Sequence, residues 1–304
     1  MDLAVEIGPL KAPNPIFLAS GTWGFGERLK DHLDLSSLGG LFTKGISLHP
    51  REGNPPPRLA ETPCGLVNAI GLENPGVETF CQHIWPWLSK SNRNILVNVF
   101  GETIQEFLEV ITKLSSLPLA GIELNISCPN VEKGGLSFAQ DASAVKVLVQ
   151  EVRDIYQGFL VVKLSPVGPV FEVAEAALSA GADALTAANT YPAMVVDLWQ
   201  RKPALSRGFG GLSGPAVKPL TLKLVFELWQ RFRAPIFGCG GITSGKDVLE
   251  YILCGASAVQ VGTATLLDPQ NPSQILQEIE TVLPSLLKEG ENLSSLRGGL
   301  KLDA

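Results

Sequence analysis

Closely spaced cysteines are missing from this sequence. The five cysteines stand at positions 64, 81, 128, 239 and 254, and no two of them form the C-x-x-C pair that is typical of zinc and iron–sulfur sites. We therefore expect no metal site, and reduced thiols rather than disulfides. A buried, inert role is the expectation for every cysteine except Cys128.

Strong positive charge and long apolar runs are also missing. The chain has 304 residues and a formal net charge of -6, and its lysines and arginines form no run, so a nucleic-acid surface has little electrostatic support. No apolar stretch reaches the roughly 20 residues that span a bilayer, and the first residues lack the pattern of a signal peptide. We expect a cytoplasmic protein that acts on a small molecule and binds neither nucleic acid nor membrane.

The dinucleotide-binding fingerprint G-x-G-x-x-G is absent as well. Its nearest approach, residues 208–214, has the wrong glycine spacing and follows no expected strand. A nicotinamide dinucleotide is therefore not expected to have its own fold here. The three histidines fall outside every expected strand end, so a histidine-based mechanism has no candidate.

Short apolar runs of strand length recur along the whole chain. Because helix-length gaps separate most of them, they predict strand–helix units and a parallel sheet. Eight strands favour one (β/α)8 TIM barrel, a single domain over residues 1–304, above an open doubly wound sheet. The expected strands are residues 16–19, 41–43, 95–99, 122–126, 160–164, 184–188, 235–238 and 258–261.

Glycines and prolines predict the connections. Residues 180–183 and 254–257 each end an expected helix and lead into a strand, so we expect a left-handed glycine C-cap there, and likewise at Gly39 and Gly121. The proline-dense residues 50–63 predict an ordered loop over the mouth of the barrel.

Polar residues stand where the apolar strands end. In a barrel these positions converge on one face and build the active site. A buried amine or amide without a partner costs roughly 1 to 3 kcal/mol, so a purely structural barrel would not carry so many. The set includes Ser20, Lys44, Gly45, Asn98, Asn125, Cys128, Lys163, Asn189, Thr190, Gly240, Gly241, Gly262 and Thr263.

The turns after the seventh and eighth strands predict a phosphate site. Gly240-Gly241 and Gly262-Thr263 would expose backbone N–H groups, and residues 244–247 resemble a capping box for the next helix. FMN fits this site better than a dinucleotide. Lys44 or Lys163 near the pyrimidine end of the flavin would stabilise the negative charge of its reduced form.

Cys128 lies directly after the fourth expected strand, between the amides of Asn125 and Asn130. These two amides could hold a polar heterocycle beside the thiol. A free thiol titrates near about 8.5, so it can accept a proton from an activated carbon. We expect Cys128 to be the proton-handling residue.

With these motifs in place, the sequence resembles class 1 dihydroorotate dehydrogenases, and among them the NAD-linked B type. The resemblance covers nearly the whole chain, and its motifs are specific when taken together. They are Asn14-Pro15, Ala19-Ser20-Gly21-Thr22, Thr43-Lys44-Gly45, residues 50–58, Asn68-Ala69-Ile70-Gly71-Leu72, residues 125–130, Lys163-Leu164-Ser165-Pro166, Asn189-Thr190, residues 211–215, Gly240-Gly241-Ile242 and Gly262-Thr263.

The resemblance implies FMN-dependent oxidation of (S)-dihydroorotate to orotate in pyrimidine biosynthesis, with Cys128 taking the C5 proton and flavin N5 taking the C6 hydride. It implies substrate binding by Lys44, Asn68, Ala69, Ile70, Gly71, Leu72, Asn125, Asn130, Asn189 and Thr190. It implies FMN binding by Ser20, Lys44, Gly45, Asn98, Asn125, Lys163, Ala188, Gly214, Gly240, Gly241, Gly262 and Thr263.

The resemblance also implies a partner. B-type enzymes pass electrons to NAD+ through a second subunit that carries FAD and a [2Fe–2S] cluster, and a homodimer within a heterotetramer is expected. The membrane-bound, quinone-using class has serine where this chain has Cys128. Residues 191–194 and 207–209 depart from the family pattern, and we expect them to change the rim of the substrate site rather than the reaction.

Three other functions fit the same residues. A Schiff-base aldolase or phosphate-sugar synthase would use Lys163 as its amine and the same phosphate turns. A reductase similar to dihydropyrimidine dehydrogenase would use the same flavin. A cofactor-binding core that is inert without its partner is the alternative that is not an enzyme.

Overall fold

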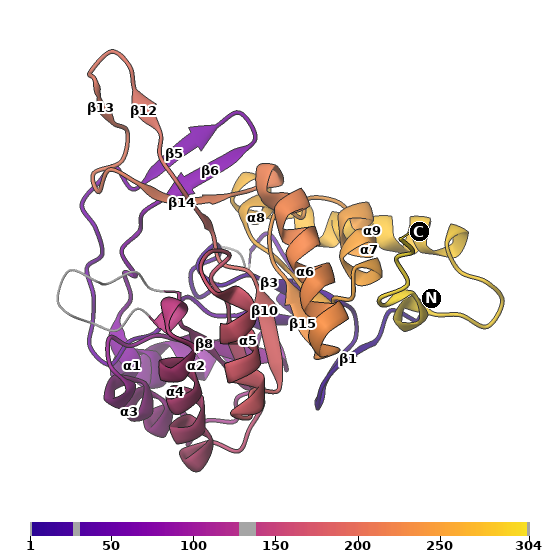
Figure 1. Cartoon of the computed structure of the whole chain (residues 1–304), viewed down its shortest axis with the longest axis horizontal. Coiled ribbons are helices and arrows are strands. Elements are labelled where there is room, and N and C mark those ends of the chain that lie inside the picture. Colours follow the sequence, from indigo (N-terminus) through magenta and orange to yellow (C-terminus); the bar gives the residue numbers. More distant parts are fainter. Residues whose placement is uncertain (1, 27–30, 128–137, 303–304) are drawn as a thin grey trace.

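Eight parallel strands close into a barrel in the computed structural model, which describes residues 2–26, 31–127 and 138–302 (Figure 1). The strand order is β10-β15-β16-β3-β4-β7-β8-β9, and β9 pairs with β10 to close the ring. The predicted (β/α)8 barrel is therefore confirmed, with every barrel strand where the apolar runs predict it. The strands are β3 (Ile16–Leu18), β4 (Gly40–Phe42), β7 (Ile95–Val99), β8 (Gly121–Asn125), β9 (Leu160–Lys163), β10 (Ala184–Ala187), β15 (Ile236–Gly238) and β16 (Ala258–Val261).

Amphipathic helices flank the strands. In α3 the buried residues Phe107, Val110, Ile111 and Leu114 recur at helical spacing, and the Thr103 hydroxyl caps its N-terminus. The helices expected at 173–180 and 248–254 are confirmed and begin a few residues earlier, as α5 and α7. The α-helices are α1 (Gly76–Thr79), α2 (Trp85–Leu88), α3 (Ile104–Leu114), α4 (Ala142–Ile155), α5 (Val170–Ser179), α6 (Lys218–Phe232), α7 (Gly245–Leu253), α8 (Thr263–Leu267) and α9 (Asn271–Val282).

Shorter helical turns complete the connections. A π-helical turn, Phe80–Ile84, joins α1 to α2, and 3-10 turns cover Leu35–Ser37, Phe138–Gln140, Pro215–Val217, Leu283–Ser285 and Leu293–Leu296. None of the helices in the described part of the chain has the length and apolar character needed to cross a bilayer.

Aromatic rings fill the barrel interior toward the amino ends of its strands. Phe17, Phe42 and Phe237 are fully buried, and the Phe237 centroid lies 5.1 Å from that of Phe17 and 5.0 Å from that of Phe42. Phe159, which precedes β9, contacts Phe237 from the same end. This part of the barrel interior is therefore packed with aromatic rings.

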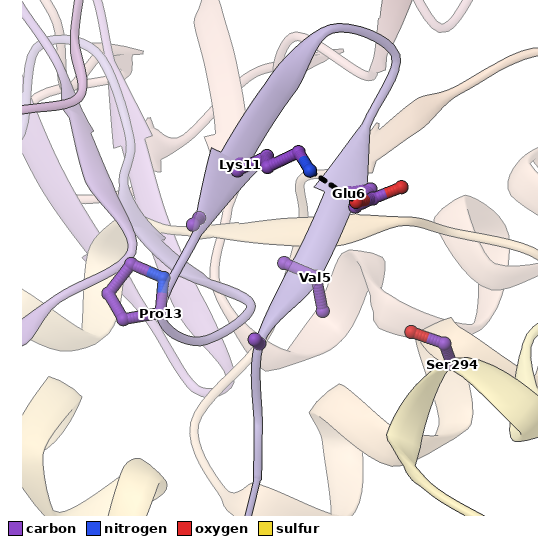
Figure 2. A pocket seen from close by; sticks show the side chains of 7 residues that line it. Val5, Glu6, Lys11, Pro13 and Ser294 are labelled. Carbon is purple, nitrogen blue, oxygen red and sulfur yellow. Dashed lines mark ion pairs between the residues drawn. The ribbon is translucent and has the colours of Figure 1, made fainter.

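An N-terminal hairpin, β1 (Val5–Ile7) and β2 (Leu10–Ala12), covers that end of the barrel. The turn at Gly8 lies beside residues that precede β9, β10 and β15. A cavity of about 480 Å³ next to the hairpin is lined by Ser294 and the hairpin strands, with an exposed Lys11–Glu6 ion pair of 3.1 Å at its edge (Figure 2). Because barrel active sites form at the opposite end, this cavity is not a candidate active site.

A second sheet lies at the carboxyl ends of the barrel strands. It has the antiparallel order β11-β14-β6-β5, formed by β5 (Leu59–Thr62), β6 (Gly65–Asn68), β11 (Tyr191–Ala193) and β14 (Gly210–Ser213). The prediction of a loop over the whole of residues 50–63 was wrong for its last part, because residues 59–62 pair with β6. The density of prolines predicts a loop, but the point at which the loop ends depends on pairing with β6, which the local sequence does not show.

A further hairpin, β12 (Val196–Asp197) and β13 (Lys202–Pro203), projects from this sheet (Figure 1). Its tip exposes Leu198 and Trp199, the latter by 92%. Residues 191–194 and 207–209, which depart from the family pattern, stand at the two bases of this hairpin.

The glycine predictions divide into two kinds. Gly181 and Gly255 take positive φ values of 110° and 111°, as expected of helix C-caps. Gly39 and Gly121 do not, so the prediction was wrong for them. A β-carbon on Gly39 would lie 2.1 Å from the Asn14 carbonyl oxygen, and one on Gly121 would lie 2.8 Å from that of Phe159. Close packing between neighbouring segments is what requires glycine there.

Candidate active site

Most of the predicted site residues that the structure describes lie at or near the carboxyl ends of the barrel strands, whereas residues 68–72 and Gly214 come from β6 and β14 of the second sheet and the segments after them. Lys163 ends β9 and is only 5% exposed, in register with Asn125 on one side and Thr186 on the other. Ser127 Oγ donates a hydrogen bond of 3.2 Å to the Lys163 carbonyl oxygen. Lys163 is thus a buried cation in the barrel mouth and not a surface lysine.

A buried polar cluster lies deeper in the barrel. The Glu123 carboxylate accepts hydrogen bonds from Asn98 Nδ2 at 2.5 Å, Thr186 Oγ1 at 2.6 Å and Gln260 Nε2 at 3.0 Å. Glu123, Asn98 and Thr186 are fully buried, and Gln260 is 1% exposed. Two oxygens of the cluster, Asn98 Oδ1 and Gln260 Oε1, are buried without a hydrogen-bond partner among the described residues. Such atoms are costly unless a ligand or water satisfies them.

Lys44 lies at the mouth with an acidic neighbour. Its Nζ is 3.6 Å from Glu73 Oε2, and Arg58 NH1 is 3.0 Å from the same oxygen. Because Glu73 is shared between two cations and is half exposed, it neutralises Lys44 only weakly. Lys44 is therefore available to an anionic ligand.

Amides converge on the substrate side of the mouth. Asn189 Nδ2 donates to Asn125 Oδ1 at 3.3 Å, and Asn68 Nδ2 donates to the Gly211 carbonyl at 3.0 Å. Thr190 packs directly on Gly211, since a β-carbon on Gly211 would come within 1.8 Å of Thr190 Oγ1. The structure brings these five positions together from β6, β8 and β14 and from the segment that follows β10.

The segment Ala69–Leu72 is held over the mouth by Asn54. Asn54 Nδ2 donates to the Ala69 carbonyl at 2.8 Å, and the Asn54 backbone N–H donates to the Ile70 carbonyl at 2.9 Å. Gly71 has a φ of 77°, and a β-carbon there would lie 2.5 Å from Asn54 N. The proline-rich loop thus positions the predicted substrate segment.

The turns after β15 and β16 are ready to receive hydrogen-bond acceptors. The backbone N–H groups of Gly240, Gly241, Gly262 and Thr263 have no hydrogen-bond partner among the described residues. Burial raises the pKa of Tyr251 well above its usual value, so its hydroxyl stays protonated and donates to the Gly240 carbonyl at 2.6 Å. Four free donors on two adjacent turns fit a phosphate group.

The N-terminus of α7, in contrast, is already satisfied. Ser244 and Asp247 form the predicted capping box, and Asp247 Oδ2 accepts from the N–H groups of Thr243 at 2.8 Å and Ser244 at 2.9 Å. Gly245 N–H donates to Glu278 Oε2 at 2.7 Å. These carboxylates leave the glycine turns as the available phosphate site.

Ser20, Gly214 and Ala188 line the same end. Thr263 Oγ1 donates to Ser213 Oγ at 2.8 Å, which places β14 and its successor Gly214 beside the last turn. Ala188 donates its N–H to the Cys239 carbonyl at 3.1 Å. Ser20 follows β3 and is half buried.

The cysteines described by the structure differ in exposure. Cys254 is buried as expected, and Cys81 and Cys239 are half buried. Cys64 is exposed, so the prediction of a buried thiol was wrong for it, because it lies in the tight turn between β5 and β6. Burial raises the pKa of the Cys239 thiol, which keeps it protonated at neutral pH. Among the described residues, no cluster of histidine, cysteine and acidic side chains could hold a metal.

Cys128 and Asn130 lie in the interval 128–137, outside the described residues. Their roles remain predictions.

Several polar residues of the site escaped the sequence analysis. Glu123 and Gln260 lie inside strands rather than at their ends, and Glu73 and Ser213 lie in segments that the site recruits through tertiary contacts. The sequence does carry one signal for Glu123 and Gln260, because each is a charged or amide residue that interrupts an apolar strand.

Comparison with known proteins identifies the relatives of this chain. The matching family model is described as dihydroorotate dehydrogenase and covers residues 2–283. Three relatives carry the name dihydroorotate dehydrogenase B (NAD(+)), catalytic subunit. The one from Geotalea uraniireducens (strain Rf4) is 47% identical over 284 residues, 93% of each chain. The one from Geobacter sp. (strain M21) is 45% identical over 303 residues, 99% of each chain, and the one from Thermoanaerobacter pseudethanolicus (strain ATCC 33223 / 39E) is 40% identical over 304 residues, the whole of each chain.

Proposed function

The chain belongs to the dihydroorotate dehydrogenase family, and we propose how its residues carry out the oxidation of dihydroorotate to orotate that this membership assigns to it. The protein is an oxidoreductase that acts on a CH–CH bond, in pyrimidine biosynthesis. The relatives named above carry the name of a dihydroorotate dehydrogenase, which gives no support to the aldolase and reductase alternatives.

We propose that FMN is the cofactor, and one observation carries this proposal. Among the described residues, Asn98 Oδ1 is buried without a hydrogen-bond partner beside Gly45, and the last two turns of the barrel offer four N–H groups that are likewise unpaired there. A ligand with an N–H group at one end and a phosphate at the other satisfies both features. FMN has both and, when bound, supplies a hydride acceptor at flavin N5.

Two groups of residues would hold FMN in this proposal. The phosphate would lie on Gly240, Gly241, Gly262 and Thr263, with Gly214 and Ser20 beside them. Lys163, Lys44, Gly45, Asn98, Asn125 and Ala188 would surround the ring. The buried positive charge of Lys163 would favour an anionic reduced ring over a neutral one.

The substrate would lie against the converging amides. Dihydroorotate carries one carboxylate and a ring of alternating amide donors and acceptors, which require both a cation and side-chain amides. Lys44 supplies the cation, and Asn68, Asn125, Asn189 and Thr190 supply donors and acceptors from three sides. Residues 69–72 would complete the enclosure, together with Asn130.

Cys128 would remove the proton from C5 of the substrate. A thiolate accepts a proton from carbon in one step and returns it to water after the product leaves, so the thiol is regenerated in each cycle. Its place in the sequence, between Asn125 and Asn130, supports this role.

Electrons would leave through a partner subunit that carries FAD and a [2Fe–2S] cluster and reduces NAD+, within a heterotetramer built on a homodimer of this chain. The names of the relatives, each a catalytic subunit of an NAD(+) enzyme, support this assignment. The sequence supports it too, because it has no C-x-x-C pair and no dinucleotide fingerprint of its own.

An anaerobic absorbance experiment tests cofactor and substrate together. The purified chain, loaded with FMN, is expected to lose the visible absorbance of oxidised flavin when dihydroorotate is added. Dihydrouracil at the same concentration should cause no bleaching. Adding NAD+ to the bleached chain alone should produce no NADH, whereas ferricyanide should restore the colour. Bleaching by dihydrouracil instead would contradict the proposed substrate, and failure to bind FMN would contradict the proposed cofactor.

A further inference from the structure

Glu123 is a buried carboxylate to which the proposed reaction gives no role. It lies in the middle of β8, between the fully buried residues Ile122 and Leu124, and is itself fully buried. Its three hydrogen-bond partners come from β7, β10 and β16, so the carboxylate lies within the barrel and not on its wall. A charge is expensive at such a depth, and a purely apolar core would serve stability as well.

The carboxylate determines which way two side-chain amides face. A carboxylate only accepts hydrogen bonds, and an amide has one donating and one accepting end. Asn98 and Gln260 therefore both turn their NH2 groups toward Glu123, and their oxygens face away. Those two oxygens are the ones that have no hydrogen-bond partner within the described part of the chain.

Asn98 Oδ1 is directed at the cofactor position. It would lie 2.9 Å from a β-carbon built on Gly45, so it faces the turn that follows β4. Oxidised flavin has a single ring N–H, at N3 of its pyrimidine ring, and an acceptor at this point matches it. Without Glu123, the Asn98 amide could rotate and present its NH2 group to the cofactor. Two hydrogen-bond donors, this NH2 group and the flavin N3–H, would then face each other.

We infer that Glu123 is a positioning residue that holds Asn98 with its oxygen toward the cofactor, so that the site selects a ligand with an N–H group, the N3–H of a flavin. This inference rests on the proposed FMN cofactor. Glu123 acts through Asn98 and does not touch the ligand itself.

The first test replaces the carboxylate by an amide of the same shape. Glu123→Gln offers one acceptor to three donors, so the Asn98 orientation is no longer fixed. FMN should bind the apoprotein about 10- to 100-fold more weakly, measured as quenching of FMN fluorescence on titration. Thr186→Val is the matched control, because it removes a different donor from the same carboxylate and leaves Asn98 in place. Its FMN affinity should stay within about twofold of the parent value.

The second test restores the acceptor by exchanging the two functional groups. In the double variant Glu123→Gln with Asn98→Asp, the new glutamine donates to one carboxylate oxygen of Asp and leaves the other facing the cofactor. FMN affinity should recover most of the loss. If Glu123 had only a structural role, FMN affinity would not recover in the double variant. The inference is overturned if Glu123→Gln binds FMN as tightly as the parent. It is also overturned if the double variant folds but binds FMN as weakly as Glu123→Gln does.

A third measurement needs no substitution and serves if Glu123→Gln does not fold. The parent protein should bind FMN methylated at N3 at least about tenfold more weakly than FMN, because the methyl group replaces the donor that Asn98 requires. Equal binding of the two flavins would overturn the inference. If the parent protein binds neither FMN nor its N3-methylated form, the proposal that FMN is the cofactor is wrong. That outcome is different from equal binding of the two flavins, which contradicts only the role of Glu123.

Discussion

Asn189 Nδ2 lies 3.3 Å from Asn125 Oδ1, although the two residues are 64 positions apart. Asn189 follows β10 by two residues and Asn125 is the last residue of β8. The strand between β8 and β10 in the barrel is β9, which carries Lys163 at its end. The two amides thus meet beside the end of the strand that carries the buried Lys163. A planar heterocycle could contact all three groups at once, which is what binding of dihydroorotate above a flavin would require.

Replacing Asn189 tests this substrate contact. Asn189→Ala removes one amide from the proposed substrate and one donor from Asn125, a loss of about 1 to 3 kcal/mol. The KM for dihydroorotate should rise roughly 10- to 100-fold, while the amount of FMN bound per chain is unchanged. Steady-state kinetics with ferricyanide and the flavin absorbance of the purified variant measure the two effects.

The control for Asn189 is an amide far from the site. Gln277 is exposed on α9, and Gln277→Ala should leave both KM and flavin content unchanged. An unchanged KM in Asn189→Ala would remove this residue from the substrate site.

Cys128 is tested by the rate of flavin reduction. Cys128→Ala should retain FMN but reduce it at least about 100-fold more slowly at pH 7, because general-base catalysis contributes roughly 10²- to 10⁴-fold. Cys128→Ser should keep some activity that rises toward high pH, since a hydroxyl gives up its proton less readily than a thiol. Anaerobic stopped-flow absorbance gives these rates.

Cys64 provides the matched cysteine control. It is exposed in the β5–β6 turn, and Cys64→Ala should reduce flavin at the parent rate. If Cys128→Ala also did so, Cys128 would not be the base.

The barrel could be predicted because each of its strands is a short apolar run. Burial on both faces of a parallel strand leaves a continuous hydrophobic signal, and the carboxyl end of each run then marks the site. Lys163 and Asn189 were found in this way.

The polar cluster inside the barrel could not be found in that way. Glu123 bonds to Gln260 across 137 positions, and no local pattern pairs two residues so distant. A single acidic residue in an apolar run, such as Glu123, indicates an interruption of the strand. In the structure, Glu123 is instead a buried acceptor of hydrogen bonds from three side chains. Residues 59–62 could not be recognised as a strand from the sequence either, because their pairing with β6 is defined only by the fold.

Asp247 links the phosphate side of the site to stability. Burial by itself would raise the pKa of this carboxyl, but hydrogen bonds from Lys218, Thr243 and Ser244 outweigh burial and lower the pKa below its ordinary value. A lowered pKa means stabilisation that is fully present above the unfolded-state pKa of about 3.9 and is lost as the pH falls through the folded-state pKa. Asp247→Asn should therefore lower the free energy of unfolding by about 1 to 3 kcal/mol at pH 7, and the difference from the parent should shrink below about pH 4.

Urea denaturation of the apoprotein at several pH values measures this difference. Asp154, exposed near the end of α4, is the control, and Asp154→Asn should change the free energy of unfolding by less than about 0.5 kcal/mol. A difference for Asp247→Asn that stayed constant from pH 7 to pH 3 would contradict the assigned pKa shift.

Gly21 and Gly290 form a matched pair that tests where the cofactor lies. Their φ values are 91° and 83°, and apart from the adjoining residues no described atom lies within 4 Å of a β-carbon built on either one. Alanine should therefore cost each position similar backbone strain, about 1 to 2 kcal/mol. The difference between them is location, because Gly21 follows Ser20 at the barrel mouth and Gly290 lies in the C-terminal segment after α9.

Under the proposed function, the open space at Gly21 is part of the FMN site. Gly21→Ala should weaken FMN binding at least about tenfold, since a methyl group would occupy space that the ligand needs. Gly290→Ala should bind FMN like the parent, and the two apoproteins should show similar losses in melting temperature. Fluorescence titration with FMN and thermal denaturation separate the two effects. Equal FMN affinity in both variants would mean that the space beside Gly21 lies outside the cofactor site, even though the backbone there is as strained by alanine as the backbone at Gly290.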